Sequence, residues 1–291
     1  MYTTTRSAIK DGLRYLRRQL LVSTPLNVLN ASVPTQDLAV TRNIVYGQHI
    51  RKRLDVYRPT DIAGRLPVII FFYGGKWMRG HRDDYLFAAQ CLASLGYVVV
   101  VPDYRLHPEV TFPGFVHDGA AAVAWAEAHV KDYRGDPNRL FLMGHSAGAY
   151  IASKLAYDRS YLDERNVDHS RIKGLVGMSG PYNFLSVLQD DPDLVAVFGR
   201  YADSELSQPV TFVSEEAPPS LFITGEDDPI VSPDNAYSTA ARLEALGVEA
   251  AVQAYPGIGH AGTVLALAHR FRWRAGVTED IGIFLEQHAG Q

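Results

Sequence analysis

Residues 144–148, with the sequence GHSAG, place one serine hydroxyl between two glycines. An apolar run at 140–143 precedes them, and a helical pattern of small and apolar residues over 147–157 follows. The spacing Gly-x-Ser-x-Gly suits a tight turn from strand to helix, because bulkier neighbours would collide across the turn. The helix N-terminus would favour negative charge beside the hydroxyl. The pattern predicts that Ser146 is a nucleophile.

A serine nucleophile needs a base, and the base needs an acid that orients it. Of the ten histidines, His260 in YPGIGHAG alone combines a loop at a strand end with a position downstream of both serine and acid. The acid is expected between them in chain order, where the segment GEDDPIV offers three carboxylates. We predict Asp228, which directly precedes the Pro-Ile-Val step, with Asp227 as the reserve candidate.

Ester chemistry also needs N–H groups that face the developing oxyanion, and each such donor affects the rate by roughly 10² to 10³. The N–H of Ala147 is one candidate. The segment YGGKW follows the third predicted strand, and its glycines let the backbone approach a ligand closely. We predict that Gly75 and Lys76 supply the other donors; the alternative is that YGG is only a tight turn.

Short β-rich runs alternate with longer helical patterns from about residue 37, which is typical of parallel strands joined by crossover helices. The predicted strands are 39–46, 50–57, 68–72, 97–101, 140–143, 174–178, 220–224 and 250–255. The predicted helices are 85–95, 114–130, 147–157, 235–246 and 278–288. We therefore expect an α/β fold with a mostly parallel eight-stranded sheet, an antiparallel first pair and helices on both faces.

In such a sheet the loops at the carboxyl ends of the strands meet at one edge, which brings the predicted site residues together. The segment 181–218 interrupts the alternation and is expected to form a small cap above that edge. The domain prediction is an N-terminal helical cap segment over 1–36 and a catalytic domain over 37–291. The alternative for the N-terminal pattern, which has apolar residues from Ile9 to Leu20, is an interfacial membrane helix.

Composition excludes several classes of partner. A net charge of −4 and a pI near 6.2 give no electrostatic footprint for nucleic acid. No apolar run reaches the length of a membrane span, and the N-terminus lacks the pattern of a signal peptide. Cys91 is the single cysteine, so the chain has no intrachain disulfide, which favours a reducing, cytoplasmic compartment. Its position on an apolar helical stripe favours a structural role. No motif implies a metal or cofactor, and a homodimer stays open.

Six motifs occur in the order typical of one family: FFYGGKW, VVVPDYRLHPE, FPGFVHDGAAAVAW, DPNRLFLMGHSAGA, GEDDPIV and YPGIGHAG. Together they resemble the α/β-hydrolase superfamily, and within it the bacterial carboxylesterases of the hormone-sensitive-lipase-like and feruloyl-esterase-like (BD-FAE-like) group. The resemblance covers nearly everything after residue 40. It implies that Ser146, Asp228 and His260 form the triad, that the N–H groups of Gly75, Lys76 and Ala147 form the oxyanion hole, and that 103–105 is mainly structural.

The oxyanion loop departs from the family pattern. The usual His-Gly-Gly-Gly is Tyr73-Gly74-Gly75-Lys76 here, and Trp77 gives the loop a resemblance to the His-Gly-Gly-x-Trp of kynurenine formamidases. The sequence therefore predicts a carboxylesterase that cleaves small to medium esters through an acyl-enzyme on Ser146. The alternatives are an arylformamidase and a non-catalytic binding protein on the same fold.

The substrate pocket is the least determined part. Trp77, Tyr85, Tyr182 and residues 185–201 are candidates to line an aromatic acyl or alcohol pocket, with Trp77 and Tyr182 foremost. The same residues would equally suit packing within the cap. The sequence gives no criterion that separates the two.

Overall fold

The computed structural model describes residue 26 and residues 28–61 and 63–290. Their eight strands form one sheet in the order β1-β2-β4-β3-β5-β6-β7-β8. The strands are β1 Leu38–Val45, β2 Arg53–Pro59, β3 Leu66–Phe72, β4 Val98–Pro102, β5 Gly135–His145, β6 Ile172–Met178, β7 Ser220–Gly225 and β8 Ala250–Tyr255. Strand β2 runs antiparallel to both β1 and β4, and the remaining pairs are parallel. The predicted mostly parallel sheet of eight strands is confirmed.

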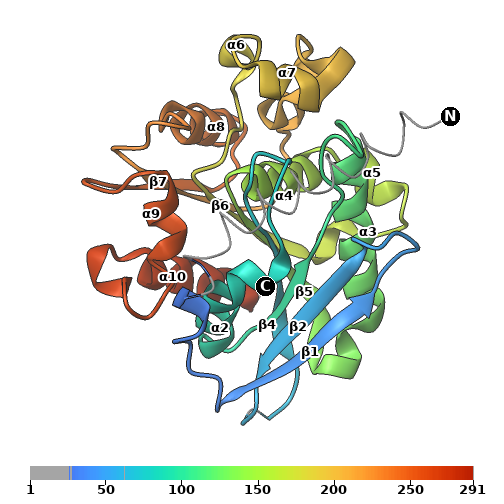
Figure 1. Ribbon diagram of the computed structural model, residues 1–291, viewed down its shortest axis with the longest axis vertical. Coiled ribbons are helices and arrows are strands. Elements are labelled where there is room, and N and C mark those ends of the chain that lie inside the picture. Colours follow the sequence, from blue (N-terminus) through green and yellow to red (C-terminus); the bar gives the residue numbers. More distant parts are fainter. Residues whose placement is uncertain (1–25, 27, 62, 291) are drawn as a thin grey trace, which may run out of the picture.

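Helices cover both faces of this sheet. Figure 1 shows α2 (Leu86–Ser94) and α10 (Val277–Ala289) on one side, and α3 (Gly114–His129) and α4 (Ala147–Tyr157) on the other. The short α5 (Ser160–Asp163) follows α4, and α8 (Asp234–Glu244) packs against β7 and β8. Because both faces are covered, β3 is buried from Pro67 to Phe72, as expected for a run of continuously apolar residues.

The second strand begins later than predicted. Residues 46–52 close the turn between β1 and β2, with a hydrogen bond of 3.0 Å from Tyr46 N to Lys52 O. Ile50, which we expected to start the strand, is 79% exposed in this turn. Ile50 was predicted in the strand because it is apolar and β-branched, whereas the turn between the two strands places it in solvent. The turn also carries Arg51.

The segment between β6 and β7 lies above the carboxyl ends of the strands, at the top of Figure 1. It contains α6 (Leu185–Leu188) and α7 (Pro192–Phe198), followed by the 3₁₀ helices η4 (Gly199–Tyr201), η5 (Glu205–Ser207) and η6 (Pro209–Phe212). We refer to residues 181–218 as the cap. The N-terminal helical pattern at Ile9 to Leu20 lies outside the described residues.

Aromatic rings join the cap to the body of the protein. Trp77 stacks on Phe115 of α3 at 5.6 Å between ring centroids and meets Phe198 of α7 edge-on at 5.1 Å. Tyr150 of α4 also meets Phe198 edge-on, at 5.5 Å. Such arrangements are favourable for aromatic pairs and add to the burial of their surface. The cap therefore packs on an aromatic core that includes Trp77, which directly follows the predicted oxyanion donor Lys76.

Candidate active site

Ser146 occupies the sharp turn between β5 and α4, to which we refer as the elbow. Its backbone has φ 55° and ψ −122°, a conformation that non-glycine residues adopt only where the surroundings enforce it. A Cβ atom on Gly144 would lie 2.4 Å from the carbonyl of Gly148, and one on Gly148 would lie 2.0 Å from the carbonyl oxygen of Phe72. The two glycines are therefore required by close backbone approach, which is the reason that we gave for the motif.

The structure joins Ser146, His260 and Asp228 through hydrogen bonds. Ser146 Oγ lies 2.8 Å from His260 Nε2, and His260 Nδ1 lies 2.9 Å from Asp228 Oδ2. These residues come from three strand ends: the turn after β5, the first residue of α9 (His260–Leu265) after β8, and the loop after β7. Since an ionised carboxylate only accepts, Nδ1–H donates to Asp228, and Nε2 is left to accept from the serine hydroxyl.

The two neighbouring aspartates differ clearly in environment. Asp228 is 8% exposed, and its second oxygen accepts hydrogen bonds from the N–H groups of Ile230 at 2.9 Å and Val231 at 3.0 Å. Burial opposes ionisation, but the hydrogen bonds from His260 and these two N–H groups together hold the pKa of Asp228 below its usual value. Asp227 is exposed. Of the two aspartates, Asp228 is therefore the one that contacts His260.

His145 contacts the backbone of His260 and is not part of the hydrogen-bonded chain Ser146–His260–Asp228. Its Nε2–H donates to the backbone carbonyl of His260 at 3.0 Å, and the two rings lie 5.0 Å apart. Burial, together with the neighbouring His260, lowers the pKa of His145 to about 3, so this ring stays neutral at ordinary pH. It can hold the backbone at His260 without placing a second positive charge beside the triad.

The loop after β3 has the backbone of an anion site. Gly75, Lys76 and Trp77 all have positive φ, at 139°, 55° and 54°. Within the described residues, the N–H groups of Gly75, Lys76 and Ala147 have no hydrogen-bond acceptor. Gly74 packs against the elbow, since a Cβ atom there would lie 3.1 Å from Ser146 Cβ. Two of the predicted donors, Gly75 and Lys76, therefore lie in a loop that packs against the serine, and the third, Ala147, directly follows the serine at the start of α4.

A cavity of about 950 Å³ opens at these residues. Ser146 and His260 form part of its wall, together with Gly75, Lys76 and Ala147, and the predicted pocket residue Trp77 also lines it. Tyr182 does not line this cavity. Tyr182 is 1% exposed, and its ring packs on Phe222 of β7 at 5.0 Å. From this segment the cavity is lined instead by its neighbours Pro181, Asn183 and Phe184 and, within the predicted range 185–201, by Ser186, Val187, Asp191 and Leu194.

Lys76 forms contacts that the sequence did not indicate. Its Nζ lies 2.8 Å from Asp191 and 3.1 Å from Asp193, at the start of α7 in the cap. Partial burial alone would lower the pKa of Lys76, but the hydrogen bonds that its Nζ donates to these carboxylates raise the pKa. The order Asp191-Pro192 is a typical helix start, and Asp191 caps α7, yet nothing local indicates that Lys76 lies opposite.

The fold and this hydrogen-bonded Ser–His–Asp arrangement define an α/β-hydrolase. The BD-FAE family model matches residues 54–243, which is more than half of the 291 residues, and the chain belongs to this family. A second model, of the prolyl oligopeptidase family, matches residues 197–290. The match to BD-FAE spans the elbow, the oxyanion loop and Asp228, whereas the second match spans Asp228 and His260.

Curated relatives are similar over most of the chain. A protein named "Probable isoprenylcysteine alpha-carbonyl methylesterase" from Arabidopsis thaliana is 30% identical over 246 residues, 76% of this chain and 51% of the relative. The "Probable carboxylic ester hydrolase LipM" of Mycobacterium tuberculosis is 29% identical over 279 residues, 88% of this chain and 64% of the relative. The chain thus spans about half to two thirds of the length of these two proteins.

Solved structures agree on the fold. Esterase B from Lactobacillus rhamnosis superposes with a TM-score of 0.80 at 19% identity, covering 96% of this chain and 95% of that one. An esterase from Pyrobaculum calidifontis superposes with a TM-score of 0.75 at 22% identity over 99% of both chains. At this identity the likeness establishes the α/β-hydrolase architecture.

Proposed function

We propose that the protein is a serine carboxylesterase that cleaves small to medium carboxylic esters through an acyl-enzyme on Ser146. The observation that carries the proposal is the pair of hydrogen bonds from Ser146 Oγ to His260 Nε2, 2.8 Å, and from His260 Nδ1 to Asp228, 2.9 Å. The names of the curated relatives, a methylesterase and a carboxylic ester hydrolase, support the same class of reaction.

In the first half of the reaction, Ser146 Oγ attacks the acyl carbon while His260 Nε2 takes the hydroxyl proton. Asp228 stabilises the imidazolium that forms and keeps the ring in the required tautomer. The carbonyl oxygen becomes an oxyanion, which the N–H groups of Gly75, Lys76 and Ala147 stabilise. When the intermediate collapses, the bond to the alcohol oxygen breaks, and His260 returns its proton to the leaving alcohol.

In the second half, His260 takes a proton from water, and the resulting hydroxide attacks the acyl carbon of the ester on Ser146. Collapse of this intermediate releases the carboxylic acid and returns the proton to Ser146. The cavity of about 950 Å³ is large enough for both parts of a medium-sized ester. Because the triad and the backbone donors supply every step, the mechanism assigns no role to a cofactor.

The experiment measures turnover of short nitrophenyl esters by the purified protein and by Ser146→Ala. We expect turnover in the wild type and a loss of roughly 10⁴-fold or more in the variant, with an unchanged melting temperature. A fluorophosphonate probe should label the wild type at Ser146. A wild-type protein that neither turns over esters nor takes the probe would instead be a binding protein on a hydrolase fold.

A second candidate function is amide hydrolysis by an arylformamidase, which the segment YGGKW from Tyr73 to Trp77 favours by its likeness to kynurenine formamidases. Comparing kcat/KM for N-formylkynurenine with that for nitrophenyl esters separates the two functions. We expect the ester to be preferred. A preference for the formamide by ten-fold or more would replace the first proposal with the second.

The location is also a proposal, and we assign the protein to the cytoplasm. Its single cysteine, Cys91, has no second cysteine in the chain with which to form a disulfide, which suits a reducing compartment. Within the described part of the chain, no helix is long and apolar enough to cross a membrane. Fractionation of cells that express the full chain tests the assignment, and recovery outside the cytoplasm would contradict it.

A further inference from the structure

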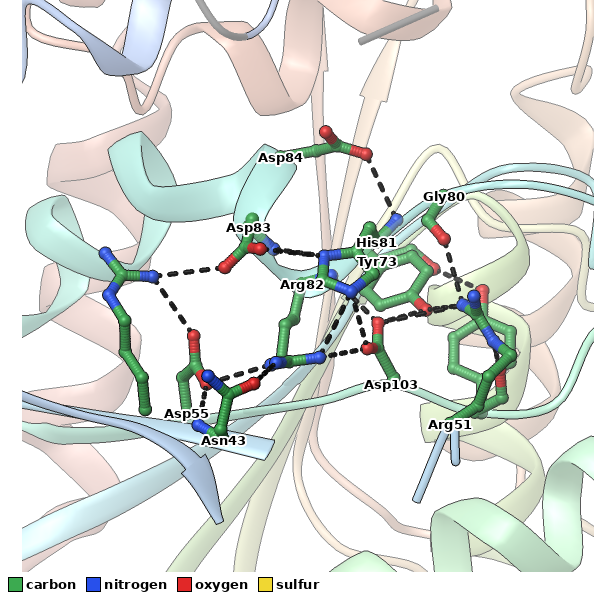
Figure 2. Close-up of polar contacts among 12 residues, drawn as sticks. Asn43, Arg51, Asp55, Tyr73, Gly80, His81, Arg82, Asp83, Asp84 and Asp103 are labelled. Carbon is green, nitrogen blue, oxygen red and sulfur yellow. Dashed lines mark hydrogen bonds and ion pairs between the residues drawn. The ribbon is translucent and has the colours of Figure 1, made fainter. Parts of the chain in front are cut away.

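A network of buried charges and tyrosines lies next to the oxyanion loop, outside the triad (Figure 2). Asp103, at the end of β4, is at its centre and is 1% exposed. It accepts hydrogen bonds from the backbone N–H of Arg82, at 2.9 Å, and from the guanidinium of that residue. Arg82 in turn donates to Asp55 of β2 at 2.8 Å. The network therefore links the strands β2 and β4 to the segment after the oxyanion loop.

Tyr73 connects this network to the oxyanion loop. It is the first residue of the loop and is fully buried, and its hydroxyl donates to Asp103 Oδ1 at 2.8 Å. The same hydroxyl accepts from Arg51 Nη2 at 2.7 Å. Burial and the neighbouring carboxylate hold the pKa of Tyr73 well above its usual value, so the hydroxyl keeps its proton throughout the working range.

Three tyrosine rings stack around this point. The ring of Tyr73 lies between those of Tyr104, at 4.8 Å, and Tyr85, at 5.7 Å, with interplanar angles of 22° and 25°. The outer two bind the loop backbone. Tyr104 OH donates to the carbonyl of Tyr73 at 2.7 Å, and the N–H of Gly74 donates to Tyr85 OH at 3.2 Å. The peptide group between Tyr73 and Gly74 is therefore fixed at both its oxygen and its nitrogen.

The other end of the loop is held by the same groups. Arg51 Nη2 donates to the carbonyl of Gly80 at 2.9 Å as well as to Tyr73 OH. Gly80 lies against the tyrosine, since a Cβ atom there would be 2.8 Å from Tyr73 Cε2 and 2.8 Å from the carbonyl oxygen of Gly74. Arg51 and Tyr73 thus join the two ends of the loop 73–80. The residues with positive φ, from Gly75 to Trp77, lie between these ends.

We propose that Tyr73 is a positioning residue for the oxyanion hole: its hydroxyl, held between Asp103 and Arg51, fixes the loop so that the N–H groups of Gly75 and Lys76 face the reacting carbonyl. This inference rests on the proposed function, because it needs an oxyanion to form. An oxyanion donor is effective only at hydrogen-bond distance from the developing charge, so a shift of the loop weakens the transition state more than the bound substrate.

The test is Tyr73→Phe, which removes one hydroxyl and keeps the stacked ring. We expect kcat for a short nitrophenyl ester to fall roughly 10- to 100-fold, as for small misplacements of catalytic groups, while KM changes less than about two-fold. Tyr157→Phe is the matched control. It removes a buried tyrosine hydroxyl that bonds Ser220 at 3.0 Å, remote from the loop, and should leave kcat unchanged.

A trifluoromethyl ketone, which forms a charged hemiketal with Ser146, reports on the oxyanion hole itself. We expect Tyr73→Phe to raise the inhibition constant of the ketone by the same factor by which it lowers kcat/KM, since both depend on oxyanion binding. A merely structural role would lower the melting temperature without this parallel loss. Equal kcat and equal inhibition in variant and wild type would overturn the positioning role, whereas a wild type without turnover or fluorophosphonate labelling would overturn the function and this role with it.

If Tyr73→Phe does not fold, Arg51→Lys tests the same contact. Lysine keeps the positive charge but lacks the planar fork that reaches Tyr73, Gly80 and the carbonyl of Tyr104 at once. We expect a fall in kcat in the same direction, with a small change in KM. An Arg51→Lys protein with wild-type kcat and wild-type ketone inhibition would count against the proposal.

Discussion

The oxyanion loop has two sides that are held in different ways. On one side, Tyr73 and Asp103 are buried and form hydrogen bonds that water cannot reach. On the other, the side chains of Lys76, Asp191 and Asp193 are 35%, 39% and 60% exposed in the ion pairs that reach the cap. Buried, fully bonded groups resist displacement, while exposed ion pairs contribute little and weaken with salt. We therefore expect the side at Tyr73 to be rigid and the side toward the cap to be adjustable.

The comparison extends to the backbone. Lys76 and Ser146 both hold φ at 55° against their intrinsic preference, and each such residue costs on the order of 1–3 kcal/mol that the surrounding structure must offset. At Ser146 the close packing of Gly144 and Gly148 offsets this cost. At Lys76 the groups around Tyr73 offset it. The strained positions thus coincide with the proposed nucleophile and a proposed oxyanion donor.

The largest effect is expected in the proposed triad, outside both sides of the loop, for Asp228→Asn. The amide would favour the wrong tautomer of His260, so we expect kcat for a nitrophenyl ester to fall roughly 10⁴-fold with little change in KM. Asp227→Asn is the control and should retain wild-type kcat, because Asp227 is exposed. If the loss followed Asp227 instead, the assignment of the acid from the 2.9 Å contact would be wrong.

A smaller effect is expected on the adjustable side, for Lys76→Met. This change keeps the backbone N–H but removes the ion pairs with Asp191 and Asp193, and we expect KM to rise by at most about five-fold with kcat unchanged. Raising salt from about 0.05 M to about 0.5 M should move the KM of the wild type toward that of the variant. Lys131→Met, on an exposed lysine outside the cap, controls for the lost charge.

A large fall in kcat for Lys76→Met would break the comparison. It would mean that the cap contacts, and not only the groups around Tyr73, fix the oxyanion donors. Steady-state kinetics at both salt concentrations distinguishes the two outcomes, since only an effect through exposed charges is screened.

A further effect concerns stability instead of turnover, at the point where the cap returns to the body. Lys154 of α4 is buried, contacts the Phe212 ring of η6 at 3.2 Å and pairs with Asp158 at 2.8 Å. Burial lowers its pKa from 10.5 to about 8. Between these values the unfolded chain binds the proton more strongly, so the free energy of unfolding gains a contribution that increases with pH.

Urea unfolding of the wild type and of Lys154→Met across this pH range measures that contribution. The difference between the free energies of unfolding of wild type and variant should be constant below about pH 8 and rise from there to pH 10.5. Because the tyrosines and Cys91 are present in both proteins, their titration cancels in this difference. A difference that stays flat across the range would show that the lysine keeps its ordinary pKa in the fold.

The order and type of the elements could be predicted because each depends on local pattern. The helix 147–157 has the predicted bounds, since a glycine-bounded turn fixes its start and an apolar stripe its length. The start of β2 was predicted three residues early, because whether Ile50 pairs depends on a turn closed by Tyr46 and Lys52. Tyr182 was assigned to the pocket because an aromatic residue beside a cap suits either environment, and only packing against Phe222 decides.

The sequence alone determined the candidate chemistry. The glycines around Ser146, the order of serine, acid and histidine, and the strand that precedes each loop are local features, and they suffice because parallel strands bring their carboxyl ends to one edge. Tertiary structure decided what holds that chemistry in place. Arg51, Tyr73 and Asp103 come from a turn, a loop and a strand end with no local signal of their common purpose, and they meet because the sheet places β4 between β2 and β3.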